Sequence, residues 1–112
     1  MAQYNRHFTG SFDRLMVYVD TGILNGSVSA TREGESSLTC GDVRCVTRVY
    51  ERYSALGSNR LSLTVTFFGK DQDIQLSAIT SGGSQAVFIK INTIGESAFM
   101  DKLITLLDRY DE

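Results

Sequence analysis

Strict alternation of apolar and polar side chains over residues 61–68 is the feature that most constrains the fold of this chain. The alternating set is Leu61, Leu63, Val65 and Phe67 between Ser62, Thr64, Thr66 and Phe68. In a β-strand, successive side chains point to opposite faces, so this pattern directs one row into a core and the other mostly toward water. The segment therefore predicts a strand whose sheet is covered on one face.

The segments on either side of this strand continue the β pattern. Residues 43–54 are rich in Val, Thr and Tyr, and residues 74–80 carry further β-formers. The connections at 55–59 and 69–73 are short and contain glycine, asparagine or aspartate, which favour tight turns. Further strands are predicted at 4–9, at 27–33 and 35–40 as a hairpin around Gly34, and at 86–92. Together these segments predict a meandering antiparallel sheet.

A first helix is predicted where the apolar period changes to that of a helix. The residues at helical spacing are Phe12, Leu15, Met16, Val19 and Ile23. Ser11 precedes them as the predicted N-cap, and Gly22 or Gly26 is the predicted end.

A second helix is predicted near the end of the chain. Its apolar stripe consists of Phe99, Met100, Leu103, Ile104, Leu106, Leu107 and Tyr110. Thr93, followed three residues later by Glu96, fits a capping box that would start this helix. We expect residues 97–110 to cover the apolar face of the sheet.

These elements predict one α+β domain over residues 1–112. The expected architecture is a curved antiparallel meander sheet with two helices packed on one face, in the order β-α-β(5-6)-α. The 112 residues are 42% hydrophobic and 21% charged, which is typical of a globular domain with one core. The element order resembles the helix-grip architecture of the START and Bet v 1 superfamily, and also the saddle of TATA-binding protein. Either resemblance implies an arrangement of elements and no function.

Charge and composition exclude some functional classes. The net charge of -2 gives no overall attraction for nucleic acid. The N-terminal residues lack the apolar segment of a signal peptide, and no later stretch approaches the ~20 apolar residues that span a bilayer. We therefore expect a cytoplasmic protein with no membrane partner, in which Cys40 and Cys45 remain thiols.

The loop at Ser81, Gly82, Gly83 and Ser84 invites comparison with a phosphate-binding loop. Such a loop works by directing backbone N–H groups and a helix N-terminus at the anion. The lysine and hydroxyl residue of that motif are missing, and a strand is predicted after the loop. The sequence therefore favours a two-residue hairpin turn.

Candidate metal and catalytic residues are few. A zinc site would need Cys40, Cys45, His7 and Asp42 together, whereas small buried core residues on adjacent strands explain the cysteines more simply. With one histidine, there is little to activate a nucleophile or to serve acid–base chemistry. We expect no catalytic residue, no metal and no cofactor, although the sequence leaves enzymatic activity open.

Arg44, Arg48 and Arg52 fall on one face of the strand at 43–54, beside Val46 and Tyr50. Arginines interleaved with an aromatic residue can contact nucleic-acid phosphates or bases. Long arginine side chains also commonly cover the apolar side of a sheet. The acidic surroundings favour this packing role over nucleic-acid contact.

The runs VRCVTRVYERYS (43–54) and SAITSGGSQAVFIKINTIGE (77–96) resemble segments of a small uncharacterised bacterial family, a domain of unknown function. The resemblance covers most of the chain. It implies a bacterial cytoplasmic single-domain protein and transfers no active-site residue.

The function that the sequence favours is a non-enzymatic binding module. A small apolar ligand would lie between the sheet and the C-terminal helix, with the contact residues Arg48, Tyr50, Phe67, Phe88, Phe99 and Leu103. The aromatic set of Phe12, Phe67, Phe88, Phe99 and Tyr110 is expected mainly in the core. One alternative is a homodimer formed through an edge strand or through the face that carries Ser62, Thr64 and Thr66. A second alternative is nucleic-acid contact through the three arginines.

Overall fold

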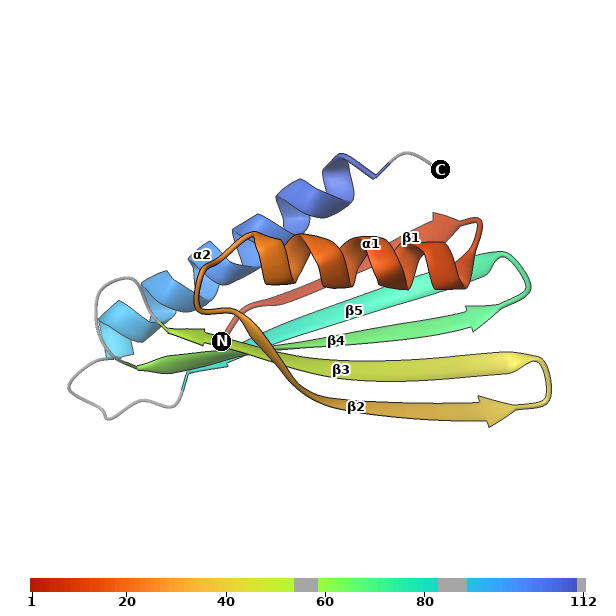
Figure 1. Ribbon diagram of the computed structural model, residues 1–112, viewed down its shortest axis with the longest axis horizontal. Coiled ribbons are helices and arrows are strands. Elements are labelled where there is room, and N and C mark those ends of the chain that lie inside the picture. The colour runs from red at the N-terminus through yellow and green to blue at the C-terminus, as the bar shows by residue number, and fades with distance from the viewer. Residues whose placement is uncertain (54–58, 83–88, 111–112) are drawn as a thin grey trace.

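The computed structural model describes residues 1–53, 59–82 and 89–110, with the side chains of 89–96 excepted. The elements in chain order are β1 (Gln3–Thr9), α1 (Phe12–Asn25), β2 (Thr31–Cys40), β3 (Val43–Tyr53), β4 (Arg60–Lys70), β5 (Asp73–Gly82) and α2 (Ile89–Asp108). The predicted α+β class is confirmed, with both helices on one face of the sheet (Figure 1). Within the described ranges, no helix is long and apolar enough to cross a membrane.

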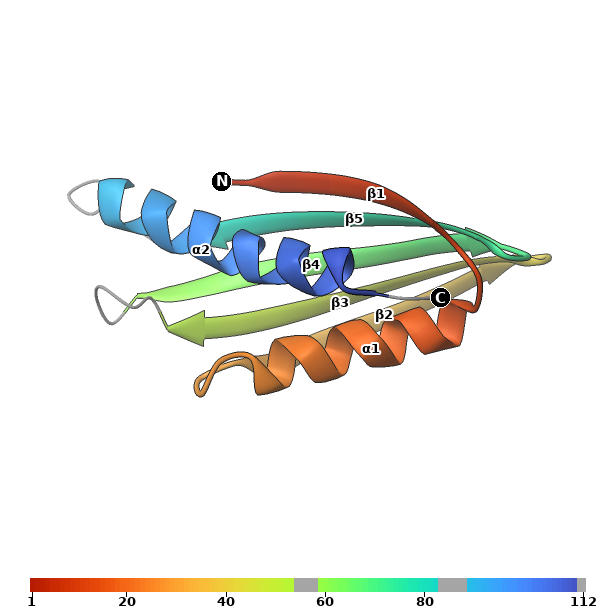
Figure 2. The same ribbon diagram turned by 90° about the horizontal axis from the view of Figure 1, so that it is seen from above.

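The sheet has the strand order β1-β5-β4-β3-β2, and every neighbouring pair is antiparallel. Helix α1 carries the chain from the β1 edge to the β2 edge, and the meander then returns to place β5 beside β1. In the view from above, α1 runs along the β2 and β3 side while α2 crosses β4 and β5 (Figure 2). The two helices therefore divide one face of the sheet between them.

The core lies between the sheet and the helices, as the alternation predicted. Leu61, Leu63, Val65 and Phe67 of β4 are fully buried, and the apolar stripes of both helices pack on them. Ser11 caps α1 by accepting a hydrogen bond from the Arg14 backbone N–H at 3.2 Å. Of the two glycines predicted to end α1, Gly26 is the C-cap.

The opposite face of the sheet has no helix over it. Ser62, Thr64 and Thr66 lie there half-buried among their strand neighbours, and Thr47 and Thr66 share a hydroxyl hydrogen bond. The exposed apolar residues include Leu38, Phe68 and Ile79. The sequence had indicated this division into a covered and an open face.

The hairpin predicted within 27–40 is wrong. Residues 31–40 form one edge strand, β2, which pairs with β3, and its register shifts between Arg32 and Gly34. Gly34 therefore marks a bulge in a strand, a common role for glycine in β-structure. The other strand predictions at 4–9, 43–54, 61–68 and 74–80 correspond to β1, β3, β4 and β5, although Ser54 lies outside the described residues.

The prediction of a strand at 86–92 is also wrong where the structure describes it. Ile89–Asn92 belong to α2, and Ala86–Phe88 lie outside the described residues. Thr93 and Glu96, predicted to cap the helix, are inside it. Four strands lie between the helices over the ranges that the structure describes, where five or six were predicted. The buried residues of α2 after 96 include Phe99, Met100, Leu103 and Leu107, which confirms that this helix covers the sheet.

A close contact at Gly69 supports a stability prediction. A Cβ placed on Gly69 would lie 2.5 Å from a ring carbon of Phe12, the first residue of α1. Because Phe12 is buried against Phe67, the ring has little room to move. We expect Gly69→Ala to lower the free energy of unfolding by about 1–3 kcal/mol in urea titrations.

The matched control is Gly34→Ala, since a Cβ there meets no atom within 4 Å. Its unfolding free energy should stay near that of the wild type. Equal stability of the two variants would contradict the proposed packing of Phe12 on Gly69.

Candidate ligand-binding site

Three arginines of β3 point toward the helices. Arg44, Arg48 and Arg52 share the covered face of the sheet with the buried residues Val46 and Tyr50, which confirms that they form one stripe. The side chains of Arg44 and Arg48 are 38% and 13% exposed, and Arg52 as a residue is 7% exposed. Burial therefore increases along the strand toward Arg52.

Arg44 is paired at the open end of the stripe. Its Nη1 lies 3.0 Å from Oδ1 of Asp13 in the first turn of α1, and its guanidinium carbon lies 4.2 Å from the centre of the Phe12 ring. One carboxylate and one aromatic face therefore compensate this charge.

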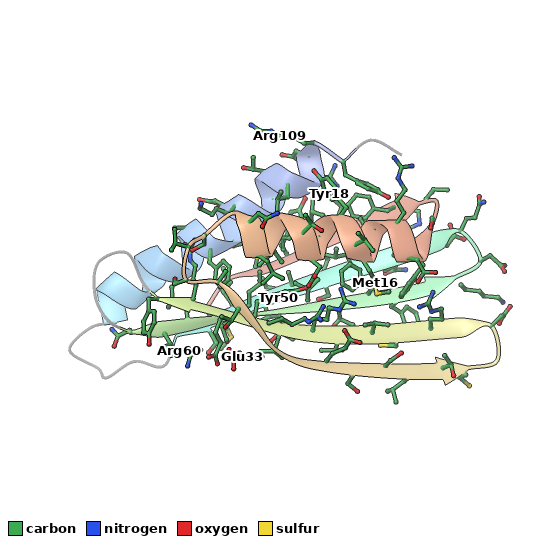
Figure 3. All side chains as sticks on the ribbon, viewed as in Figure 1. Met16, Tyr18, Glu33, Tyr50, Arg60 and Arg109 are labelled. Carbon is green, nitrogen blue, oxygen red and sulfur yellow. The ribbon has the colours of Figure 1, made fainter. Side chains whose placement is uncertain are left out.

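Arg48 lies in a more buried network with Tyr50, which Figure 3 labels beneath α1. Its Nε donates to Glu35 at 2.7 Å, and its Nη1 lies 3.8 Å from Asp20 of α1. Asp20 also accepts from the Tyr50 hydroxyl at 2.8 Å and from Arg32 at 3.1 Å. Burial acts to lower the pKa of Arg48, but the hydrogen bond to Glu35 and the interaction with Tyr50 outweigh it and raise that pKa.

Arg52 has no such partner. Its guanidinium carbon lies 4.5 Å from the centre of the Phe99 ring of α2. Among the described residues it has no ion pair or hydrogen bond, and its Nε is buried without an acceptor. Burial lowers the pKa of Arg52 with nothing to oppose it, yet an arginine remains cationic at neutral pH.

The spacing of α1 explains the difference between the arginines. Asp13 and Asp20 are seven residues apart, which is about 10.5 Å along a helix, and Arg44 and Arg48 are four apart, which is about 13 Å along a strand. The aspartates of α1 and the arginines of β3 are therefore spaced by nearly the same distance. Seven residues after Asp20 comes Ser27, which lies beyond the end of α1, and four residues after Arg48 comes Arg52. At this third position α1 therefore offers no carboxylate to the arginine.

A hollow of about 310 Å³ lies beside Arg52, between the end of α1, β3 and α2. Its accessible lining is mostly apolar and comprises Gly22, Ile23, Gly26, Ser27, Arg52, Phe99, Asp101, Lys102, Leu103, Thr105 and Leu106. Lys102 bridges the helices by donating from Nζ to the Gly26 carbonyl oxygen. The hollow therefore combines an apolar wall with a buried cation that no described carboxylate pairs with.

The residues predicted to contact a ligand are only partly brought together. Phe99 and Leu103 line the hollow. Tyr50 and Phe67 are fully buried in the core, Arg48 belongs to the network with Asp20, and Phe88 lies outside the described residues. Arg52, Ser27 and Lys102 were not assigned to a pocket by sequence reasoning. The signal for Arg52 was its place on the β3 stripe.

Comparison with known protein families adds one result. The model of a family of unknown function, DUF6054, matches residues 1–111. The chain belongs to DUF6054. The match includes both segments, 43–54 and 77–96, on which the resemblance to a domain of unknown function was based. No curated protein matches this DUF6054 chain.

The DUF6054 structure also places the other candidate residues. His7 is on edge strand β1 and Cys40 on the opposite edge strand β2, so the sheet itself separates these two proposed zinc ligands. Cys40 is exposed and Cys45 half-buried, so their predicted place in the core is wrong, although they do lie on adjacent strands. In the described part of the chain, no group of three or more His, Cys, Asp or Glu side chains is placed to hold a metal.

The predicted hairpin turn at Gly82-Gly83 lies partly outside the described residues. Ser81 and Gly82 end β5, the next described element is α2, and Gly83 and Ser84 lie outside the described residues. The argument that a strand follows the loop is therefore wrong, whereas the missing lysine and hydroxyl residue remain an argument against a phosphate-binding motif.

Tyr50→Phe tests the network that holds α1 on the sheet. The variant removes the hydrogen bond to Asp20, so we expect a loss of about 1–3 kcal/mol of unfolding free energy near pH 7. Burial and the hydrogen bond to Asp20 raise the pKa of Tyr50 above its ordinary value of 10.0. The stabilisation from this raised pKa is complete below about pH 10 and is lost as the pH rises further.

Chemical unfolding from pH 8 to pH 11 should therefore show a steeper loss of stability in the wild type than in Tyr50→Phe. Tyr53→Phe is the control, because Tyr53 is an exposed tyrosine of the same strand. Parallel curves for the wild type and Tyr50→Phe would contradict the role of this hydroxyl.

Proposed function

We propose that this DUF6054 domain is a non-enzymatic binding module that takes a small ligand in the hollow between α1, β3 and α2. The proposal is carried by one observation, an apolar hollow of about 310 Å³ whose wall includes the buried Arg52, which has no ion pair or hydrogen bond with the residues that the structure describes. The volume lies at the lower end of the range usual for ligand sites, about 300–1,000 Å³. The ligand should therefore be small.

The energetics support occupation of the hollow. Withdrawing an ion from water costs several kcal/mol, whereas a cation–π contact such as that of Arg52 with Phe99 returns about 0.5–2 kcal/mol. The free domain therefore keeps an unfavourable charge next to an open apolar space. A ligand that removes apolar surface from water and satisfies Arg52 relieves both costs at once.

The rigid surroundings of the hollow favour a preformed site. A Cβ placed on Gly22 would lie 2.5 Å from a methyl carbon of Leu106, so α1 and α2 approach closely along one wall. The Tyr18 hydroxyl donates to the Leu106 carbonyl oxygen at 2.6 Å and fixes the same pair of helices. A preformed site lowers the ordering cost of binding.

Thr105→Trp tests this function, because Thr105 is an exposed residue of α2 that lines the hollow. Native mass spectrometry of freshly purified wild-type protein should show a bound small molecule, and octanol, octanamide or octanoate should raise its thermal midpoint. Both effects should be lost in Thr105→Trp because the indole ring occupies the space.

Thr21→Trp serves as the control, since Thr21 is an exposed threonine of α1 outside the lining of the hollow. It should bind as the wild type does. The function is refuted if the wild type carries nothing and none of the three probes shifts its midpoint, or if both tryptophan variants bind equally well.

A second candidate is a homodimer through the uncovered sheet face. It is favoured by the exposure of Leu38, Phe68 and Ile79, which are 66%, 50% and 40% exposed on the same face as Ser62, Thr64 and Thr66. Burial of this surface against a second copy would remove apolar area from water.

Light scattering coupled to size exclusion tests this candidate. We expect a dimer that Phe68→Glu converts to a monomer, while Val17→Glu, at a position of α1 that is 65% exposed, serves as the control for added charge. A wild type that remains monomeric at every concentration rules the dimer out.

A further inference from the structure

The charges around the hollow indicate the charge of the ligand, just as the volume of the hollow indicates its size. The described residues that line the hollow include two cations, Arg52 and Lys102, and one carboxylate, Asp101, so together they have a formal charge of +1. Lys102 already donates to a carbonyl oxygen at the end of α1, which leaves Arg52 as the donor that has no acceptor within the described part of the chain. A ligand with a single negative charge would neutralise these lining residues. A doubly charged phosphate monoester would leave an excess negative charge beside Asp101.

We infer that the hollow binds a carboxylate with a short apolar body, and that the guanidinium of Arg52 holds the carboxylate group. The inference rests on the binding function proposed above. The planar guanidinium presents paired N–H donors that match the two oxygens of a carboxylate. The apolar body would contact Phe99, Leu103 and Ile23, which line the rest of the hollow.

The other two arginines of the stripe show what Arg52 requires. Arg44 has the carboxylate of Asp13, and Arg48 has those of Glu35 and Asp20. The corresponding helix-series residue near Arg52 is Ser27, which has no charge. The ligand's carboxylate therefore takes the role at the third arginine that protein carboxylates fill at the first two.

Arg52→Met is the first test, with octanoate as the probe and octanamide as its neutral counterpart in isothermal titration calorimetry. Methionine preserves an unbranched apolar stem and removes the buried charge. We expect octanoate affinity to fall about tenfold or more and octanamide affinity to stay unchanged. The thermal midpoint of the ligand-free variant should rise, because an uncompensated buried charge is gone.

Arg44→Met is the matched control, since Arg44 is an arginine of the same stripe that already has its carboxylate. Its octanoate affinity should equal that of the wild type. Inorganic phosphate is a further probe and should bind more weakly than octanoate, because it lacks the apolar body.

Ser27→Asp provides a second variant that does not depend on replacing a buried arginine. The new carboxylate places a negative charge in the lining, where it satisfies Arg52 and repels an anionic ligand. Octanoate affinity should be about tenfold lower than in Ser27→Asn, the neutral isostere.

The outcomes separate this inference from the proposed function. Equal binding of octanoate and octanamide, unchanged octanoate affinity in Arg52→Met or Ser27→Asp, or phosphate binding as tight as octanoate overturns the carboxylate inference while the hollow remains a binding site. Failure of all the organic probes to bind a wild type that also carries no small molecule on purification overturns both.

Discussion

Charge compensation on the covered face of the sheet is the constraint on which the rest of this structure depends. Positions 44, 48 and 52 of β3 direct arginines under the helices, where an unpaired ion is costly. Arg44 and Arg48 are paired with Asp13 and Asp20 of α1, so α1 lies along β3 with a carboxylate beside each of these two arginines. With α1 in this position, its last turn stops short of Arg52 on β3.

The end of α1 produces the hollow. The chain turns away after Gly26, so no further residue of α1 covers Arg52, and α2 closes the other side through Phe99 and Leu103. The close approach of Gly22 to Leu106 brings the helices together next to this space rather than across it. The same geometry that satisfies two arginines therefore leaves the third beside an open apolar wall. Such a buried, unsatisfied group is a cost to the free protein and an asset for binding.

Local periodicity predicted the central elements because their burial is one-sided. Leu61 to Phe67 and the stripe from Phe12 to Ile23 each face one core, so their spacing reports their structure directly. The segment at 86–92 failed because Val87, Ile89 and Ile91 alternate over too few residues to distinguish a strand from the first turns of a helix. At 27–40 the reading failed because Gly34 forms a bulge as readily as a turn.

The candidate site was predictable only in part. Phe99 and Leu103 were found because they belong to an apolar helix stripe, and the three arginines were found because they share a strand face. Which arginine lacks a carboxylate depends on how α1 lies on β3, and no local pattern states this. Asp13 and Asp20 are seven residues apart and the arginines four residues apart, which contains this information. It can be used only once the direction of α1 over the sheet is known.

Arginine side-chain NMR tests the central claim most directly. In protein labelled with ¹⁵N-arginine, the Nε–H signal missing from the spectrum of Arg52→Lys belongs to Arg52. Addition of octanoate should move this signal and leave those of Arg44 and Arg48 in place, because their carboxylate partners are already bound. An unmoved Arg52 signal under conditions in which octanoate binds, or a shift confined to another arginine, would contradict the account.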